Sequence, residues 1–290
     1  MHNILPSKTK LKLYAELVRL NRPIGIYLLL WPTLWGLWFA SNSFPNTKLL
    51  IIFSLGVVFM RSAGCAINDY ADRDIDLHVA RTKERPLTSG KITANEALGV
   101  FAALAFASFL LVLQLNSNTI LLSIVAVILA ASYPFTKRYH YFPQVHLGAA
   151  FAWAIPMAYT AITETAPTLD AWLLFIAALL WTTAYDTQYG MVDREDDLKI
   201  GVKSTAILFG KHDTFIIGAL QLIALMLLTI VGMMNDRGWA FYSSILIAVG
   251  FILYQQLLTQ EKEPAKCLQA FLNNNWLGMT IFIGIAIDYL

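Results

Sequence analysis

The chain carries little charge. Charged residues make up only 14% of its 290 positions, and the net charge is +2. Because the basic residues are spread among loops and not massed on one element, the sequence argues against a nucleic-acid partner. Hydrophobic residues make up 57%, and the mean hydropathy is positive. So much apolar surface excludes a water-soluble globule and predicts a membrane protein with the lipid bilayer as its solvent.

Cysteine and histidine are also scarce. Cys65 and Cys267 could form at most one bridge, and both lie near the ends of apolar runs on the side expected to be reducing. We therefore predict no structural disulfide. The five histidines are scattered, and neither histidine nor cysteine lies at ligand spacing near the acidic residues described below. That composition argues against a zinc or copper site.

Long apolar runs dominate the sequence. Nine of them have roughly the 17–25 residues that a membrane-spanning helix needs. Their approximate bounds are 24–40, 49–67, 95–115, 118–135, 144–163, 169–187, 214–233, 239–258 and 270–289. Thr93 and Glu96 have the spacing of a capping box, and Asp170 is expected at an N-cap. The sequence predicts an all-α, polytopic membrane protein with nine transmembrane helices, forming a single domain over residues 1–290.

The distribution of basic residues predicts the orientation. All of them except Lys48, Arg61 and Arg237 fall on the side of the membrane that holds the N-terminus. By the positive-inside rule, the N-terminus is cytoplasmic and the C-terminus lies outside. Residues 1–23 suit an amphipathic helix on the inner leaflet, with a basic face and an apolar face. The apolar face comprises Leu11, Tyr14, Leu17 and Val18, and the basic face comprises Lys8, Lys10, Lys12 and Arg19.

Two acidic stretches follow the inner ends of apolar runs, where carboxylates are costly. They read Asp72-Arg73-Asp74-Ile75-Asp76 and Asp193-Arg194-Glu195-Asp196-Asp197. Asp72 aligns with Asp193 and Asp76 with Asp197 at a common offset that spans four helices. This offset predicts two four-helix pseudo-repeats, with the ninth helix outside the repeat.

If the second helix continues past the membrane boundary, Asn68, Asp72 and Asp76 share one face, and Asp193 and Asp197 repeat the four-residue spacing. Oxygen ligands alone select a hard cation such as Mg²⁺, which is usually held by carboxylates together with phosphates. Two facing stripes therefore predict a diphosphate clamped by Mg²⁺. The predicted metal ligands are Asn68, Asp69, Asp72, Asp76, Asp193 and Asp197, of which Asp72, Asp76, Asp193 and Asp197 are the predicted catalytic residues.

Further polar residues near these stripes could bind substrate, and basic ones could bind diphosphate oxygens. The predicted substrate-binding residues are Arg61, Arg85, Lys137, Arg138, Tyr139, Asp186 and Lys203. Arg61 differs from the others because it lies inside a span, where an arginine should face a polar cavity. The alternatives are that the basic residues only follow the positive-inside rule and that Arg61 forms a structural ion pair.

The paired acidic motifs resemble those of the UbiA superfamily of intramembrane aromatic prenyltransferases. Further stretches are similar to its bacterial 4-hydroxybenzoate branch, namely Arg22-Pro23-Ile24-Gly25, Leu30-Trp31-Pro32-Thr33-Leu34-Trp35, Tyr185-Asp186-Thr187-Gln188-Tyr189, Lys203-Ser204-Thr205-Ala206-Ile207-Leu208-Phe209-Gly210 and Asn273-Asn274-Asn275. The resemblance covers essentially the whole chain. Gly190 stands where many relatives are expected to have alanine, a change between small residues.

This resemblance implies nine helices around a central cavity, capped by cytoplasmic loops at 68–94 and 188–213, and a Mg²⁺–diphosphate site at the acidic motifs. It also implies transfer of a polyprenyl group from polyprenyl diphosphate to the carbon ortho to the hydroxyl of 4-hydroxybenzoate. The expected setting is ubiquinone biosynthesis in the bacterial inner membrane, with no obligatory protein partner. Either Arg61 or Arg138 could hold the aromatic carboxylate.

Three other functions stay open at this point. A prenyltransferase could use another acceptor, such as a naphthoate, homogentisate or haem. A divalent-cation transporter would also place carboxylates in a helical bundle, although here both acidic clusters lie at the cytoplasmic ends of the helices. A lipid-binding scaffold would leave the acidic stripes unexplained.

Overall fold

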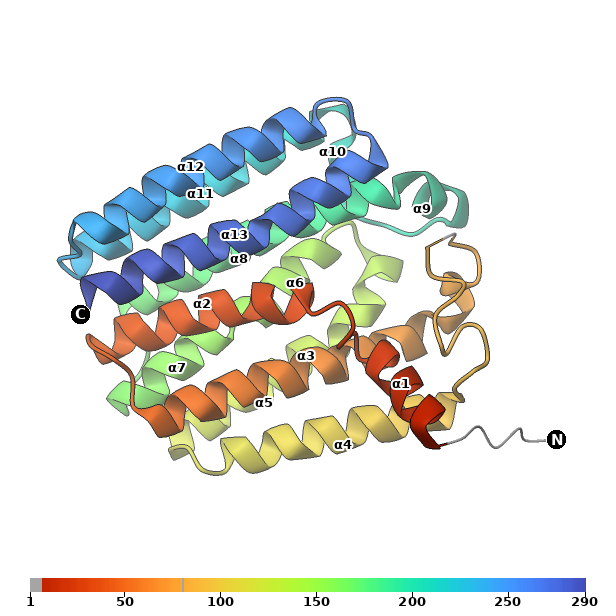
Figure 1. The fold of residues 1–290 in the computed structure, drawn as a ribbon, viewed down its shortest axis with the longest axis horizontal. Coiled ribbons are helices and arrows are strands. Elements are labelled where there is room, and N and C mark those ends of the chain that lie inside the picture. The colour runs from red at the N-terminus through yellow and green to blue at the C-terminus, as the bar shows by residue number, and fades with distance from the viewer. Residues whose placement is uncertain (1–6, 80) are drawn as a thin grey trace.

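The computed structural model describes residues 7–79 and 81–290, and this part of the chain is helical, without strands (Figure 1). Its helices are α1 Ser7–Leu17, α2 Ile24–Ser41, α3 Thr47–Asp76, α4 Ala94–Val112, α5 Ser117–Tyr139, α6 Pro143–Ala152, α7 Ala154–Thr163, α8 Leu169–Val192, α9 Arg194–Ile200, α10 Thr205–Phe209, the 3₁₀ turn η1 Gly210–His212, α11 Asp213–Met234, α12 Trp239–Thr259 and α13 Pro264–Asp288.

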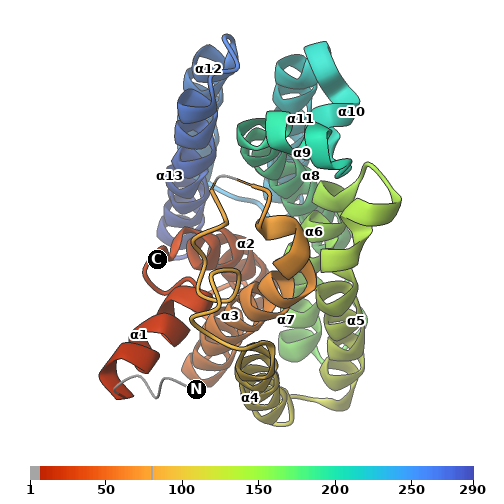
Figure 2. The same ribbon diagram turned by 90° about the vertical axis from the view of Figure 1, so that its right-hand side faces the viewer.

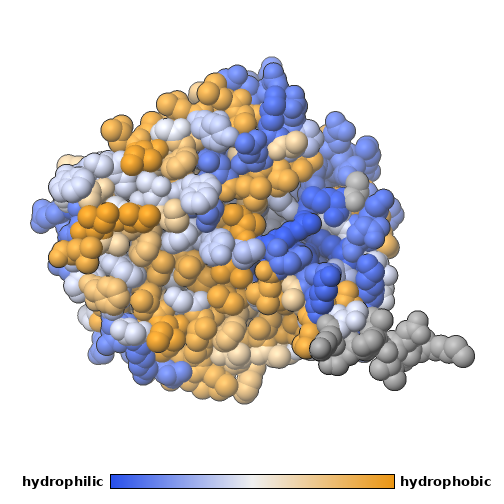
Figure 3. Space-filling view, in the orientation of Figure 1, coloured by the Kyte–Doolittle hydropathy of each residue, from blue (hydrophilic) through white to orange (hydrophobic). Residues whose placement is uncertain are grey.

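Nine helical segments of the described chain are long and apolar enough to cross a membrane. Two of them combine shorter elements, Pro143–Thr163 (α6 and α7) and Thr205–Met234 (α10 to α11). The space-filling view shows hydrophobic side chains over the long helices and hydrophilic ones gathered toward the end where α9 lies (Figures 1 and 3). The predicted all-α, nine-helix membrane architecture is confirmed, whereas the pseudo-repeat stays a prediction.

Two segments differ from their expected bounds. The fifth is divided at Trp153 into α6 and α7, because Pro156 has no N–H to donate to the preceding turn. The last helix begins at Pro264, well before the expected start at residue 270. Proline is favoured at the first position of a helix. The polar residues that follow it concealed the helix start from a hydropathy reading.

The two predicted caps have different outcomes. The capping box is confirmed, since the Thr93 hydroxyl accepts from the amide of Glu96 at 3.2 Å and Glu96 accepts from the amide of Thr93 at 2.8 Å. The predicted N-cap at Asp170 is wrong. Thr168 occupies the N-cap position of α8. Asp170 lies in the first turn of α8 and accepts a hydrogen bond from the Tyr159 hydroxyl at 2.7 Å.

The helix before the first span packs on protein. Leu17 and Val18 are buried, although the sequence assigned them to the lipid leaflet, and Leu17 belongs to a cluster with residues from α3 and α4. Arg19, assigned to the basic face, turns inward to Asp69. These three residues thus contact protein, and the interfacial position of the segment stays a prediction. The rest of the predicted 1–23 segment includes residues 1–6, which lie outside the described chain.

The C-terminal half is densely packed around buried amides. α12 packs along α13, and α11 packs along α8. The side-chain Oε1 of Gln255 accepts from Gln188 at 3.1 Å and from Gln221 at 2.7 Å, while Asn274 donates to Gln188 and accepts from Trp181, both at 2.9 Å. All five side chains are buried. This network fixes α8, which carries part of the acidic site, against three neighbouring helices.

A cavity of about 1120 Å³ lies away from this packed half. Its lining comes from α1 to α9, from connections between these helices and from the first turns of α13, whereas no described residue of α10, α11 or α12 contributes. The end-on view shows the connection after α3 crossing the middle of the polar face (Figure 2).

Candidate active site

The cavity gathers most of the residues that the sequence singled out. Those that line it are Arg61, Asn68, Asp69, Asp72, Asp76, Arg85, Lys137, Asp186, Asp193, Asp197 and Lys203. They come from α3, α5, α8, α9 and the connections between them. The two acidic stretches, distant in sequence, thus face one space.

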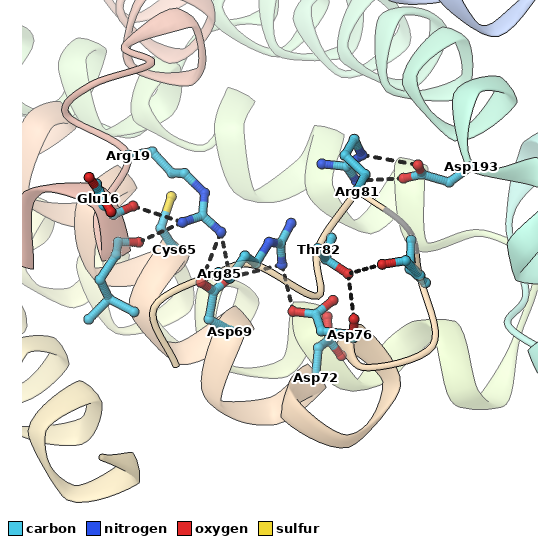
Figure 4. Close-up of polar contacts among 12 residues, drawn as sticks. Glu16, Arg19, Cys65, Asp69, Asp72, Asp76, Arg81, Thr82, Arg85 and Asp193 are labelled. Carbon is cyan, nitrogen blue, oxygen red and sulfur yellow. Dashed lines mark hydrogen bonds and ion pairs between the residues drawn. The ribbon is translucent and has the colours of Figure 1, made fainter. Parts of the chain in front are cut away.

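The first stretch lies on α3, which continues beyond its apolar part to Asp76 as the helical spacing required. Asp69, Asp72 and Asp76 are all buried. Arg85 Nη1 donates to Asp69 at 3.0 Å and to Asp76 at 2.7 Å, and Arg19 Nη2 lies 2.8 Å from both carboxylate oxygens of Asp69 (Figure 4). Asp69, a predicted metal ligand, is thus engaged by two guanidinium groups in this arrangement.

Asp72 is only half satisfied. Lys137 Nζ lies 2.5 Å from its Oδ2, and this ion pair connects α5 to α3. Its other oxygen, Oδ1, is buried without a hydrogen-bond partner. Because an unsatisfied carboxylate oxygen is costly away from water, Asp72 retains the capacity to bind a cation.

The second stretch begins where α8 ends. Asp193 lies between α8 and α9 and accepts two hydrogen bonds from Arg81, from Nε at 3.0 Å and Nη2 at 2.5 Å. Asp197 lies in the first turn of α9. Burial raises the pKa of Asp197 to about 7, and the nearby carboxylate of Asp193 adds to the rise. A nearby positive charge would relieve this cost of ionisation.

The oxygen atoms of the acidic residues suit a hard cation only when phosphate oxygens of a bound substrate complete its coordination. Within residues 7–79 and 81–290, no three His, Cys, Asp or Glu side chains are grouped closely enough to hold a metal ion by themselves. Mg²⁺, however, is usually bound through one or two carboxylates plus substrate phosphates. The free Oδ1 of Asp72 and the reluctantly ionised Asp197 fit that mode of binding.

Arg61 faces the cavity from inside α3. Its Nη1 donates to Cys65 Sγ at 3.1 Å, and its guanidinium carbon lies 5.7 Å from the centroid of the Phe151 ring. Nε is buried and has no partner. Among the described carboxylates, Asp186 acts on this charge electrostatically, but none lies within ion-pair distance. This arrangement does not support the alternative of a structural ion pair.

Two predicted substrate-binding residues lie outside the lining. Arg138 donates to the carbonyl of Ala71, and Tyr139 is 75% exposed. Lys203 does line the cavity, but its Nζ donates to the carbonyl of Tyr139 at 3.0 Å. The structure therefore distinguishes Arg61 from Arg138, which the sequence could not separate as binders of the aromatic carboxylate.

Arg19 was not expected at the site, and Arg81 was expected only as one of several basic residues after the first acidic stretch that could bind diphosphate oxygens. Both line the cavity and form ion pairs with acidic site residues. The proximity of Arg81 to the first motif was a signal, but its partner Asp193 lies in the other motif. For Arg19 no sequence signal was available, because its inward turn follows a backbone in the left-handed region, with φ of 61°.

Residues 29–281 match the model of the UbiA prenyltransferase family. The chain belongs to this family. Nine candidate spans among its described residues make it a multi-pass membrane prenyltransferase. Family membership argues against the cation transporter and the lipid-binding scaffold considered from the sequence.

Similar proteins extend over almost the whole chain. A 4-hydroxybenzoate octaprenyltransferase from Alkalilimnicola ehrlichii is 57% identical, over 95% of this chain and 94% of the relative. Proteins of the same name from Citrobacter koseri and Photobacterium profundum are 54% identical (98% of each chain) and 55% identical (97% of each chain). The likeness thus covers both acidic motifs and the last helix.

Solved structures share the fold. A UbiA homolog from Aeropyrum pernix K1, solved in its apo form, superposes with a TM-score of 0.81 at 27% identity, over 91% of this chain and 98% of that one. A UbiA homolog from Archaeoglobus fulgidus bound to GPP and Mg²⁺ has a TM-score of 0.68 at 20% identity, over 95% and 99% of the two chains. The second likeness is one of fold alone.

Proposed function

We propose that this protein transfers a polyprenyl group from polyprenyl diphosphate to the carbon ortho to the hydroxyl of 4-hydroxybenzoate, in a Mg²⁺-dependent step of ubiquinone biosynthesis. The shared name of relatives at 54–57% identity supports this pair of substrates and indicates an octaprenyl donor. The observation that carries the proposal is that two facing acidic sets and an unpaired arginine line one cavity.

Both acidic sets would bind the diphosphate through Mg²⁺. Asn68, Asp72 and Asp76 from one side and Asp193 and Asp197 from the other would hold Mg²⁺ together with diphosphate oxygens. Bound Mg²⁺ supplies positive charge that stabilises the leaving diphosphate. The binding of GPP and Mg²⁺ by a homolog with this fold supports the assignment.

Basic residues already near the carboxylates complete the diphosphate site. Lys137, Arg85 and Arg81 are paired with Asp72, Asp76 and Asp193. With the carboxylates neutralised, these cations would bind diphosphate oxygens, and Arg would offer a bidentate fork. The allylic C–O bond then breaks, and its electron pair leaves with the diphosphate.

The acceptor lies against Arg61. Its carboxylate would bind the guanidinium, which would direct the electron-rich ring toward the allylic carbon. A new C–C bond forms at the carbon ortho to the hydroxyl, and that carbon then loses its proton. Asp186 lines the same cavity from α8 and has no hydrogen-bond or ion-pair partner among the described residues, so we assign it as the proton acceptor. The apolar lining excludes water, which would otherwise quench the allylic cation.

The membrane setting follows from the donor. A polyprenyl tail is soluble in the bilayer, and the apolar part of the cavity lies between membrane-spanning helices. We propose a bacterial inner-membrane location, with the N-terminus, the acidic motifs and the loops at 68–94 and 188–213 on the cytoplasmic side, as the positive-inside rule indicates. We further propose that the chain acts as one domain and needs no obligatory protein partner.

The test is turnover by the protein purified in detergent. Mass spectrometry should detect prenylated 4-hydroxybenzoate with an octaprenyl donor in Mg²⁺ buffer, and none with EDTA. Asp72→Asn and Asp193→Asn should each lower kcat by about a hundredfold or more, the scale for losing one preorganised electrostatic contact. Asp74→Asn is the matched control, because that side chain is 86% exposed on the same helix. Normal turnover by Asp72→Asn, or preference for a naphthoate or homogentisate acceptor, would contradict the proposal.

A further inference from the structure

Gly25 and Arg61 make a close approach at the wall of the cavity. A Cβ atom built on Gly25 would lie 2.4 Å from Nε, 2.6 Å from Nη2 and 2.8 Å from Cζ of Arg61. These distances are too short for non-bonded heavy atoms, whose optimal separation is about 3.5–4.0 Å. The guanidinium therefore occupies the space that any side chain at position 25 would need.

The backbone does not require glycine at this position. Gly25 lies in the first turn of α2 and is not among the described glycines with positive φ. In a helix, glycine is less favourable than alanine by up to about 1 kcal/mol. The local structure of α2 would thus accept alanine, and the contact with Arg61 is the feature that only glycine permits.

Few contacts fix the Arg61 guanidinium. Among the described residues, its polar and ring contacts are the Cys65 sulfur and the Phe151 ring, and its buried Nε has no hydrogen-bond partner. A long side chain with so few polar contacts takes its position from the atoms packed around it. On the side of α2, that wall is the backbone of Gly25.

We propose that Gly25 is a positioning residue for the aromatic acceptor, acting through Arg61. The missing side chain lets the guanidinium lie against α2, facing the cavity, where it receives the acceptor's carboxylate. This inference rests on the proposed function, because the anion it invokes belongs to 4-hydroxybenzoate. The atoms that a methyl group would meet belong to the far end of a flexible side chain. Gly25→Ala therefore displaces the guanidinium and leaves the fold intact.

The first measurement compares the KM values for the two substrates. In Gly25→Ala, the KM for 4-hydroxybenzoate should rise about tenfold or more, equivalent to about 1.4 kcal/mol of binding. The KM for the prenyl diphosphate should stay within about twofold of wild type. Gly99→Ala is the matched control, because Gly99 lies within a span, outside the cavity lining, and an added Cβ there meets nothing within 4 Å. A change in both KM values by the same factor would overturn the inference.

A double-mutant cycle tests whether Gly25 acts through Arg61. In the Arg61→Ala background, Gly25→Ala should have no further effect on the KM for 4-hydroxybenzoate, because residues that share one interaction are not additive. Additive effects would contradict the proposal. Calorimetric titration of each variant with 4-hydroxybenzoate alone gives the same comparison without turnover, and wild-type affinity in Gly25→Ala would also overturn it.

A neutral analogue of the acceptor tests whether Gly25 acts on the acceptor's carboxylate. 4-Hydroxybenzamide has nearly the same shape but no carboxylate, so Gly25→Ala and wild type should use it with similar kcat/KM. An equal loss with both acceptors would indicate a general packing defect and overturn the inference. Failure of the wild-type protein to prenylate 4-hydroxybenzoate would overturn the proposed function as well. An active wild type together with an unaffected Gly25→Ala would overturn the role of Gly25 alone.

Discussion

Arg81 holds Asp193 by two hydrogen bonds, and this pair joins the connection after α3 to the junction of α8 and α9. The guanidinium also lies 4.7 Å from the centroid of the Tyr189 ring. Carboxylate and phosphate oxygens fit the same guanidinium fork. We therefore expect that a diphosphate bound in the cavity would compete with Asp193 for Arg81, which would make Asp193 available to a metal ion.

Arg81→Ala tests this exchange. We expect kcat/KM for the prenyl diphosphate to fall about tenfold to a hundredfold, since a hydrogen bond to a charged group contributes about 1.5–3 kcal/mol. The kcat/KM of Arg81→Lys should lie between those of wild type and Arg81→Ala, because lysine keeps the charge but lacks the bidentate fork. Lys83→Ala is the control, as an exposed basic residue of the same connection. The exchange is contradicted if steady-state assays show the same kinetics for Arg81→Ala and Lys83→Ala.

Asp197 predicts a pH dependence of stability in metal-free buffer. Its folded-state pKa of about 7 lies above the ordinary value of 3.8, so the folded protein binds the proton more tightly than the unfolded chain. Stability from this group is therefore present at low pH and is lost as pH rises from about 4 to 7. The amide that replaces the carboxyl group in Asp197→Asn cannot ionise. In EDTA, the melting temperature of this variant should therefore rise relative to that of wild type as the pH increases from 5 to 8. Parallel melting curves across that range would refute the assignment.

Features set by local sequence could be predicted in advance. The Thr93–Glu96 capping box, the continuation of α3 to Asp76 and the nine spans depend on neighbouring residues or on hydropathy alone. The helical spacing of the acidic residues likewise brought Asp72 and Asp76 to one cavity.

Features set by tertiary contact could not be predicted. The inward turn of Arg19, the pairing of Arg81 with Asp193 and the space beside Gly25 each depend on segments far apart in the sequence. The choice between Arg61 and Arg138 was of the same kind. Both are basic residues near the acidic motifs, and only the three-dimensional arrangement places one at the cavity and the other on the carbonyl of Ala71.

Asp213 anchors the connection that follows the second acidic motif. It is fully buried at the start of α11 and is paired with Arg194 and with Lys262 Nζ, the latter at 2.8 Å. Asp213→Ala leaves two partly exposed cations without their buried carboxylate, at a cost below that of breaking a fully buried pair, which is about 3–5 kcal/mol. The melting temperature in detergent should fall markedly. Glu261→Ala, which removes an exposed partner of Lys266, should change it little. Equal melting temperatures for the two variants would show that the buried cluster does not anchor this connection.

The three consecutive asparagines of α13 should differ in importance. Asn274 is fully buried and bonds both Trp181 and Gln188, whereas Asn275 accepts only from Trp31, which is partly exposed. Asn274→Ala leaves a buried indole N–H and a buried amide oxygen unsatisfied, each at a cost of about 1–3 kcal/mol. We expect its melting temperature in detergent to fall well below that of Asn275→Ala. Because Gln188 lies on α8 between Asp186 and Asp193, turnover should fall as well. Equal stability of the two variants would mean that the network does not hold α8.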